Sequence, residues 1–76
     1  MMRQIIPSAH AQARMDARGL TLGIVRYVIE HAEYEYKVRS DIVSKLTLPS
    51  GEIIKVRRKA ASANPYLITD VILVNG

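Results

Sequence analysis

Apolar side chains recur at helical spacing between residues 21 and 32. On a helical wheel, one arc collects six aliphatic residues: Leu22, Ile24, Val25, Val28, Ile29 and Ala32. The opposite arc carries Arg26, Tyr27, Glu30 and His31. This division is typical of a helix that lies on a hydrophobic core, so we expect burial above all at Ile24, Val25, Val28 and Ile29. Thr21 precedes the pattern as a suitable N-cap.

A second helix is predicted immediately before this one. Alanine and arginine, both strong helix formers, dominate residues 9 to 18. Ser8 stands before this stretch as an N-cap candidate. Gly19 follows it, where glycine commonly ends a helix in the left-handed conformation. The chain therefore places two helices in its first half.

From residue 34 the hydrophobic period changes from 3.6 to 2, the period of a strand. Four segments carry strand patterns: YEYKV (34–38), DIVSKLTL (41–48), EIIKVRR (52–58) and YLITDVILV (66–74). Pro49, Ser50 and Gly51 favour a hairpin turn between the second and third segments. The last segment has aliphatic residues on both faces, which favours a central strand. The order predicts a single α+β domain over residues 1–76, with two N-terminal helices packed on a three- to four-stranded antiparallel sheet.

The composition narrows the class of protein. The 76 residues include no Cys, Trp or Phe, so disulfides and cysteine-bound zinc are excluded and the core must be mainly aliphatic. A net charge of +4 and a pI near 9.8 favour an anionic partner, nucleic acid first. No apolar run approaches the ~20 residues of a membrane span. The opening MMRQIIPS has too short an apolar patch for a secretory signal, so we expect a cytoplasmic protein.

The first predicted helix carries His10, Arg14 and Arg18 at intervals of four residues. Residues at this spacing form one slowly turning stripe along a helix. An imidazole can act as a general base, and guanidiniums can hold a phosphate through paired hydrogen bonds. A structural role is equally compatible with the stripe: His10 would bond a nearby carbonyl and the arginines would lie along the sheet.

The stretch HAQARMDARGLT, residues 10–21, resembles the signature His-Ala-x-x-Arg-Met-x-x-Arg-Gly-(Ile/Leu)-(Ser/Thr). This signature is typical of small bacterial and phage proteins of unknown function that look similar to RelE- and BrnT-type toxins. Similar motifs occur in the barnase, EndoU, colicin and RelE-like ribonuclease toxins. The following IVRYVIEHAEYEY fits the second helix and first strand of that pattern more loosely. Beyond residue 40 the similarity is one of layout only.

The resemblance implies RNA cleavage without a metal ion or other cofactor. The family's catalytic residues would correspond to His10, Arg14 and Arg18. Its basic and hydroxyl residues on the strands would correspond to Lys55, Arg57, Tyr66 and Thr69. RNA and an antitoxin or immunity protein are the implied partners of a monomer or homodimer. One feature departs from RelE-type enzymes, which often keep catalytic groups at the extreme C-terminus: VILVNG contains no Tyr, His, Lys or Arg.

The segment KVRRK, residues 55–59, is the densest run of charge. On a strand, Lys55, Arg57 and Lys59 share one face, whereas Arg58 points to the other. A cationic sheet face suits a phosphate backbone. Solvated lysines that keep an edge strand from aggregating produce the same pattern.

Other polar residues have weaker assignments. Tyr34 and Tyr36 share a strand face and could stack on bases, but in a chain without Phe or Trp we expect them in the core or between helix and sheet. Thr69 and Asp70 interrupt an aliphatic strand, and because an unpaired buried polar group is costly, one of them should face a site or a partner. His31 is interpreted as structural. The histidines and acidic residues form no metal-ligand spacing.

Three functions stay open at this point. The first is a metal-independent endoribonuclease in which His10 lies beside convergent cations. The second is a non-catalytic nucleic-acid-binding module that uses the same basic surface. The third is a phage or bacterial protein-interaction domain whose charges only keep it soluble, and this function predicts no salt-sensitive affinity for RNA.

Overall fold

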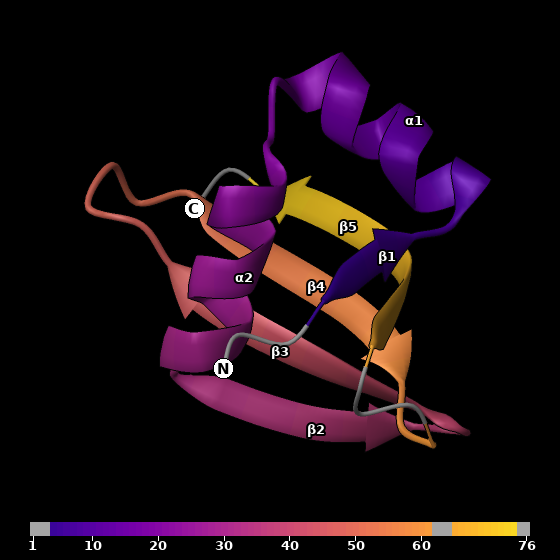
Figure 1. Ribbon diagram of the computed structural model, residues 1–76. Helices are drawn as coiled ribbons and strands as arrows, with labels where there is room; N and C mark the ends of the chain where they lie inside the picture. The colour runs from indigo at the N-terminus through magenta and orange to yellow at the C-terminus, as the bar shows by residue number, and fades with distance from the viewer. Residues whose placement is uncertain (1–3, 62–64, 75–76) are drawn as a thin grey trace.

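The computed structural model describes residues 4–61 and 65–74. Its elements follow in the order β1 (Ile5–Pro7), α1 (Ala9–Arg18), α2 (Leu22–His31), β2 (Tyr34–Val38), β3 (Asp41–Thr47), β4 (Ile53–Lys59) and β5 (Tyr66–Val74). Figure 1 shows a sheet with both helices on one side of it, α2 over its middle and α1 beside β5. The predicted α+β class and the helix pair on a sheet are confirmed.

The sheet has five strands in the order β1-β5-β4-β3-β2. Strands β2 to β5 pair antiparallel, as predicted, whereas β1 pairs parallel with β5. The sequence predicted an antiparallel sheet of three or four strands. The structure corrects this prediction in two ways, because β1 is a fifth strand and it pairs parallel with its neighbour. A three-residue segment is too short to show a period of two, and its partner begins some sixty residues later, so no local pattern identified it.

The short β1 leaves much of β5 without a strand neighbour on one side. Ile5, Ile6 and Pro7 pair with the first three residues of β5, and the backbone N–H of Ser8 donates to the carbonyl of Ile68. The chain then turns into α1, which packs against the remainder of β5 (Figure 1). The predicted central position of this strand holds only for its first residues.

Local sequence determines where the helices begin and end. The Oγ of Ser8 accepts a hydrogen bond from the N–H of Ala11, and the Oγ1 of Thr21 accepts one from the N–H of Ile24. These bonds satisfy N–H groups that have no partner inside the helix. Gly19 has φ of 66°, which is the left-handed conformation that glycine adopts without strain. All three predicted boundary residues are confirmed.

The hydrophobic core lies between the helices and the inner face of the sheet. It contains Ala11 and Met15 from α1, Val25 and Val28 from α2, and Ile5, Leu46, Ile54, Val56, Ile68 and Val71 from the strands. Ile24 and Ile29 are only partly buried against it. The apolar arc of α2 thus faces the core as predicted, with its deepest contacts at Val25 and Val28.

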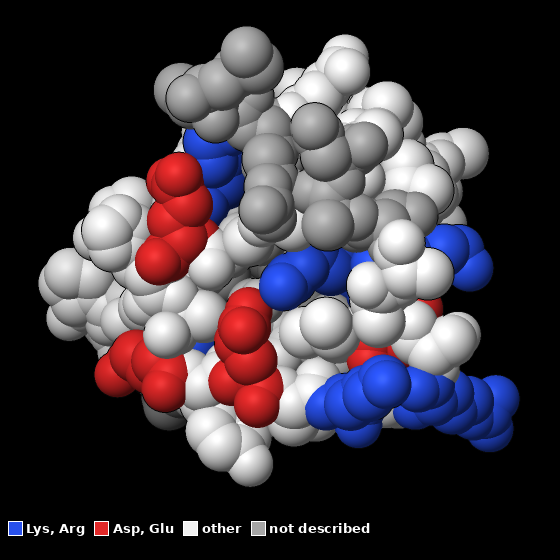
Figure 2. Space-filling model, turned by 60° about the horizontal axis from the view of Figure 1, so that its bottom comes forward, with Lys and Arg blue, Asp and Glu red and all other residues white. Residues whose placement is uncertain are grey.

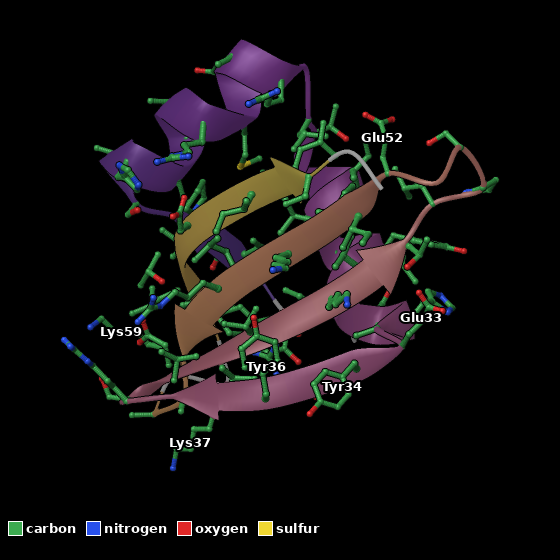
Figure 3. The ribbon with its side chains drawn as sticks, turned by 180° about the vertical axis from the view of Figure 1, so that it is seen from behind. Glu33, Tyr34, Tyr36, Lys37, Glu52 and Lys59 are labelled. Atoms are coloured by element: carbon green, nitrogen blue, oxygen red, sulfur yellow. The ribbon has the colours of Figure 1, made fainter. Side chains whose placement is uncertain are left out.

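The other face of the sheet is covered by neither helix. Ser44 of β3 is fully buried on the inner face, so its neighbour Val43 points to the other face. Tyr36 lies opposite Val43 on the paired strand and therefore points to that other face as well. Figure 3 views the molecule from this side, with Tyr34 and Tyr36 in front of the ribbon. Because the side chain of Tyr34 is 61% exposed, its expected place in the core is wrong. We call this surface the open face.

No helix among the residues that the structure describes is long and apolar enough to cross a membrane.

Candidate functional site at the groove between α1 and β5

A groove of about 420 Å³ separates the exposed side of α1 from β5. Its lining comprises His10, Ala13, Arg14, Ala17 and Arg18 from α1, and Val71, Ile72 and Leu73 from β5. The predicted stripe therefore lines a groove that is open to solvent. Ala13 and Ala17 also line the groove, and their short side chains leave space between those of His10, Arg14 and Arg18.

Asp70 joins two members of the stripe. Its Oδ1 lies 3.4 Å from Nε2 of His10 and 3.5 Å from Nε of Arg14. The same oxygen accepts a hydrogen bond of 2.9 Å from the N–H of Val71, which fixes the carboxylate at the rim of the groove. His10 remains 60% exposed and Asp70 only 21%. The groove thus presents an accessible imidazole against a positioned carboxylate.

A β-bulge explains how Asp70 reaches α1. Arg57 of β4 pairs with Asp70, but the next residue, Arg58, pairs with Ile68, so Thr69 is an extra residue in β5. A bulge of this kind redirects a side chain and bends its strand. Asp70 contacts the stripe on α1, whereas Thr69 contacts Asp41 and the backbone of Arg57, so both polar side chains have partners within the fold.

Thr69 and Arg57 belong to a second polar group next to the first. Nε of Arg57 donates to Oδ2 of Asp41 at 2.7 Å. The hydroxyl of Thr69 lies 3.4 Å from the same carboxylate oxygen and donates to the carbonyl of Arg57 at 3.2 Å. These contacts hold the Arg57 guanidinium in one orientation while it stays about one third exposed. Its remaining N–H groups can still bind an anion, because a guanidinium has five donors.

The other predicted site residues divide between the two sides of the sheet. Arg18 lines the groove, and no ion pair of its side chain is found within the described part of the chain. Lys55 lies on the open face, half buried and beside Lys45. Tyr66 packs against the core on the inner face, where the guanidinium of Arg58 stands 5.1 Å from its ring centre. His10, Arg14 and Arg18 therefore line one groove, and Arg57 and Thr69 form a separate polar group whose Arg57 pairs with Asp70. Lys55 and Tyr66 belong to neither group.

The alternation predicted for β4 is confirmed, and it separates two arginines with different surroundings. Arg57 lies on the open face with Asp41. Arg58 is largely buried on the inner face, where it donates to Ser44 at 2.7 Å and to Glu35 at 3.3 Å. Ser44 in turn donates to Glu35 at 2.6 Å. Arg58 therefore completes a structural network and is not available to a ligand of the groove.

Charge is distributed unevenly elsewhere on the surface. Figure 2, in which the β2 side of the molecule comes forward, shows the largest group of basic residues at the lower right, with further basic residues beside acidic ones elsewhere on this face. Lys37, near the end of β2, and Arg39, in the β2–β3 turn, are both exposed at the sheet edge opposite the groove. His31 stacks on Tyr27 at 4.4 Å between ring centres, in keeping with a structural role. The described residues contain no cluster of three or more candidate metal ligands.

Comparisons with protein-family models, with curated proteins and with solved structures find no match for this chain.

Proposed function

We propose that this chain is a metal-independent endoribonuclease domain that cleaves RNA in the groove between α1 and β5. One observation carries the proposal: the exposed imidazole of His10 contacts a positioned carboxylate, Asp70, in a groove that Arg14 and Arg18 also line. A proton acceptor beside cations is what cleavage of a phosphodiester by its own 2′-hydroxyl requires.

In the proposed reaction, His10 removes the proton from the 2′-hydroxyl, whose oxygen then attacks the neighbouring phosphorus. The bond from phosphorus to the 5′ oxygen breaks as the new bond forms, and the product ends in a 2′,3′-cyclic phosphate. Nε2 of His10 faces Asp70, which leaves Nδ1 to accept the proton. A water in the open groove protonates the departing 5′ oxygen, and the imidazolium returns its proton to the resulting hydroxide.

The remaining groups have supporting roles. Asp70 orients the imidazole and stabilises the imidazolium, as the carboxylate of a catalytic triad does. Arg14 and Arg18 stabilise the negative charge that grows on the phosphate oxygens, since guanidiniums match phosphate geometry. Arg57 lies across the bulge from Asp70 and holds the backbone of a neighbouring nucleotide.

The test is cleavage of a fluorescent 12-nucleotide RNA in the presence of EDTA. We expect the wild-type chain to yield 2′,3′-cyclic phosphate ends, and a 2′-deoxy substitution at the cleaved position to block the reaction. His10→Ala should lower the rate by about 10²- to 10⁴-fold, the usual contribution of a general base. His31→Ala is the matched control, because it removes the other histidine, on α2, and should leave the rate unchanged.

A second function, RNA binding without cleavage, is favoured by a different observation. The groove lining contains one imidazole and no second proton donor suited to the leaving 5′ oxygen. Salt-sensitive RNA binding by a wild-type chain that cleaves nothing would establish this function in place of the first. Equal cleavage by wild type and His10→Ala would contradict the enzymatic proposal.

A further inference from the structure

Two rows of side chains cross the open face from the groove to β2. Asp70, Arg57, Val43 and Tyr36 lie opposite one another on successive strands, and the next row contains Ile72, Lys55, Lys45 and Tyr34. Each row begins at a residue of the groove region and ends at a tyrosine. With strands spaced about 4.8 Å apart, three steps place the tyrosines roughly 14 Å from β5.

The two tyrosines form an exposed aromatic surface at the far end of these rows. Their ring centres are 5.7 Å apart with a tilt of 36°, and both rings lie over the open face (Figure 3). Tyr34 is the most exposed of the large hydrophobic residues in the described part of the chain. Neither helix covers these rings; Tyr36 is half-buried opposite Val43, whereas Tyr34 presents most of its surface to solvent.

Positive charge lies between the tyrosines and the groove. The open face carries four basic residues, Lys45, Lys55, Arg57 and Lys59, against two carboxylates, Asp41 and Asp70. Both carboxylates already have partners, Asp41 with Arg57 and Asp70 with His10 and Arg14. A polyanion crossing this face therefore meets cations in the middle and aromatic rings at the end.

We propose that the open face binds single-stranded RNA, with bases stacked on Tyr34 and Tyr36 and the backbone running over Lys55 and Arg57 into the groove. This inference rests on the proposed function and names its substrate as single-stranded. Sheet surfaces that combine stacking rings with cations bind unpaired bases in this way. A duplex keeps its bases stacked inside and offers the rings no free base faces.

The experiment measures binding of a fluorescein-labelled 12-nucleotide RNA of mixed sequence, single-stranded or annealed to its complement, by fluorescence anisotropy. His10→Ala is the background, so that cleavage does not consume the probe. Tyr34→Leu and Tyr36→Leu keep a bulky apolar side chain on β2 but remove the ring. Tyr27→Leu is the matched control, because Tyr27 is an exposed tyrosine on α2, which lies over the other face.

We expect each β2 substitution to weaken single-strand binding by about 5- to 150-fold, the usual contribution of one stacked base. Tyr27→Leu should change the affinity less than twofold, and the duplex should bind more weakly than the single strand. Because the chain has no Trp, its intrinsic fluorescence comes from tyrosine and reports directly on stacking at these rings. Tyrosine fluorescence should be quenched by the unlabelled single strand, and less so in the two β2 variants.

The outcomes separate this inference from the cleavage mechanism. Single-strand binding that depends on both tyrosines supports the open face even if the wild-type chain cleaves no RNA. Equal affinities for wild-type and β2-variant proteins overturn the inference even if cleavage at His10 is found. Equal binding of duplex and single strand, or no binding of either at low salt, also overturns it.

Discussion

The two helices have the same length and the same kind of N-cap, yet they relate to the sheet differently. α2 lies over the middle of the sheet, on β3 and β4, and buries Val25 and Val28 completely. α1 lies beside β5 and also buries two residues, Ala11 and Met15, but it has no partly buried aliphatic residues like Ile24 and Ile29 of α2, and its basic stripe lines a groove. A helix over the middle of a sheet must present a broad apolar face, whereas a helix at the edge needs less apolar area. The edge position therefore leaves more of α1 free to carry exposed polar residues, whereas α2 contributes more apolar surface to the core.

The largest expected effect tests this division on α2. Val28→Asp places an unpaired charge at a position with no solvent exposure, which typically costs about 3–5 kcal/mol. A domain of this size has only about 4–11 kcal/mol to lose, so the variant should be largely unfolded under mild denaturant. Tyr27→Asp, at the adjacent and 54% exposed position, loses only the ring contact with His31 and should cost no more than about 1.5 kcal/mol. Urea denaturation followed by circular dichroism compares the two, and similar midpoints would contradict the assignment of α2 to the core.

A substitution on α1 should have an intermediate effect, and this effect should be on the cleavage rate and not on stability. Arg18→Ala should leave the free energy of unfolding within about 0.5 kcal/mol of wild type, because the residue is exposed. It should lower the cleavage rate about 10- to 150-fold if Arg18 stabilises the phosphate, since a charged hydrogen bond contributes about 1.5–3 kcal/mol. Lys37→Ala removes an equally exposed charge from the inner side of β2 and is the control. A loss of stability without a loss of activity would assign the stripe a structural role.

The parts of the fold that depend on local sequence could be predicted. Both helices, their caps and the alternation of Arg57 and Arg58 follow from local spacing, and all of them are confirmed. β1 escaped prediction because it is three residues long and pairs with a distant strand. The contact between His10 and Asp70 was not predicted, because the bulge that directs Asp70 toward α1 arises from pairing with β4.

The tyrosines show a different limit of sequence reasoning. Alternation correctly places Tyr34 and Tyr36 on one face of β2, but it does not say which face the helices cover. That depends on how α2 crosses the sheet, which no local pattern records. The absence of Phe and Trp favoured a core role, and the exposed position of Tyr34 overturns it.

The smallest expected effect concerns how the end of α2 is attached to the sheet. Oε1 of Glu33, just after this helix, accepts a 2.6 Å hydrogen bond from the N–H of Thr47 at the end of β3. This bond, with a smaller contribution from Lys45, lowers the pKa of Glu33 below its ordinary value of 4.5. The contact therefore stabilises the fold above pH 4.5, and this contribution is lost as the pH falls through the lowered pKa.

Glu33→Gln removes the charge but keeps the shape, so it should be less stable than wild type at pH 7. The difference should shrink at pH 3, where the unfolded chain of the wild type binds the proton more readily than the folded chain does. Urea unfolding at the two pH values measures it. Glu30→Gln makes the same change in net charge on the exposed side of α2 and is the control. A gap between wild type and Glu33→Gln that is equal at both pH values would mean that the carboxylate contributes through its packing and not through its charge.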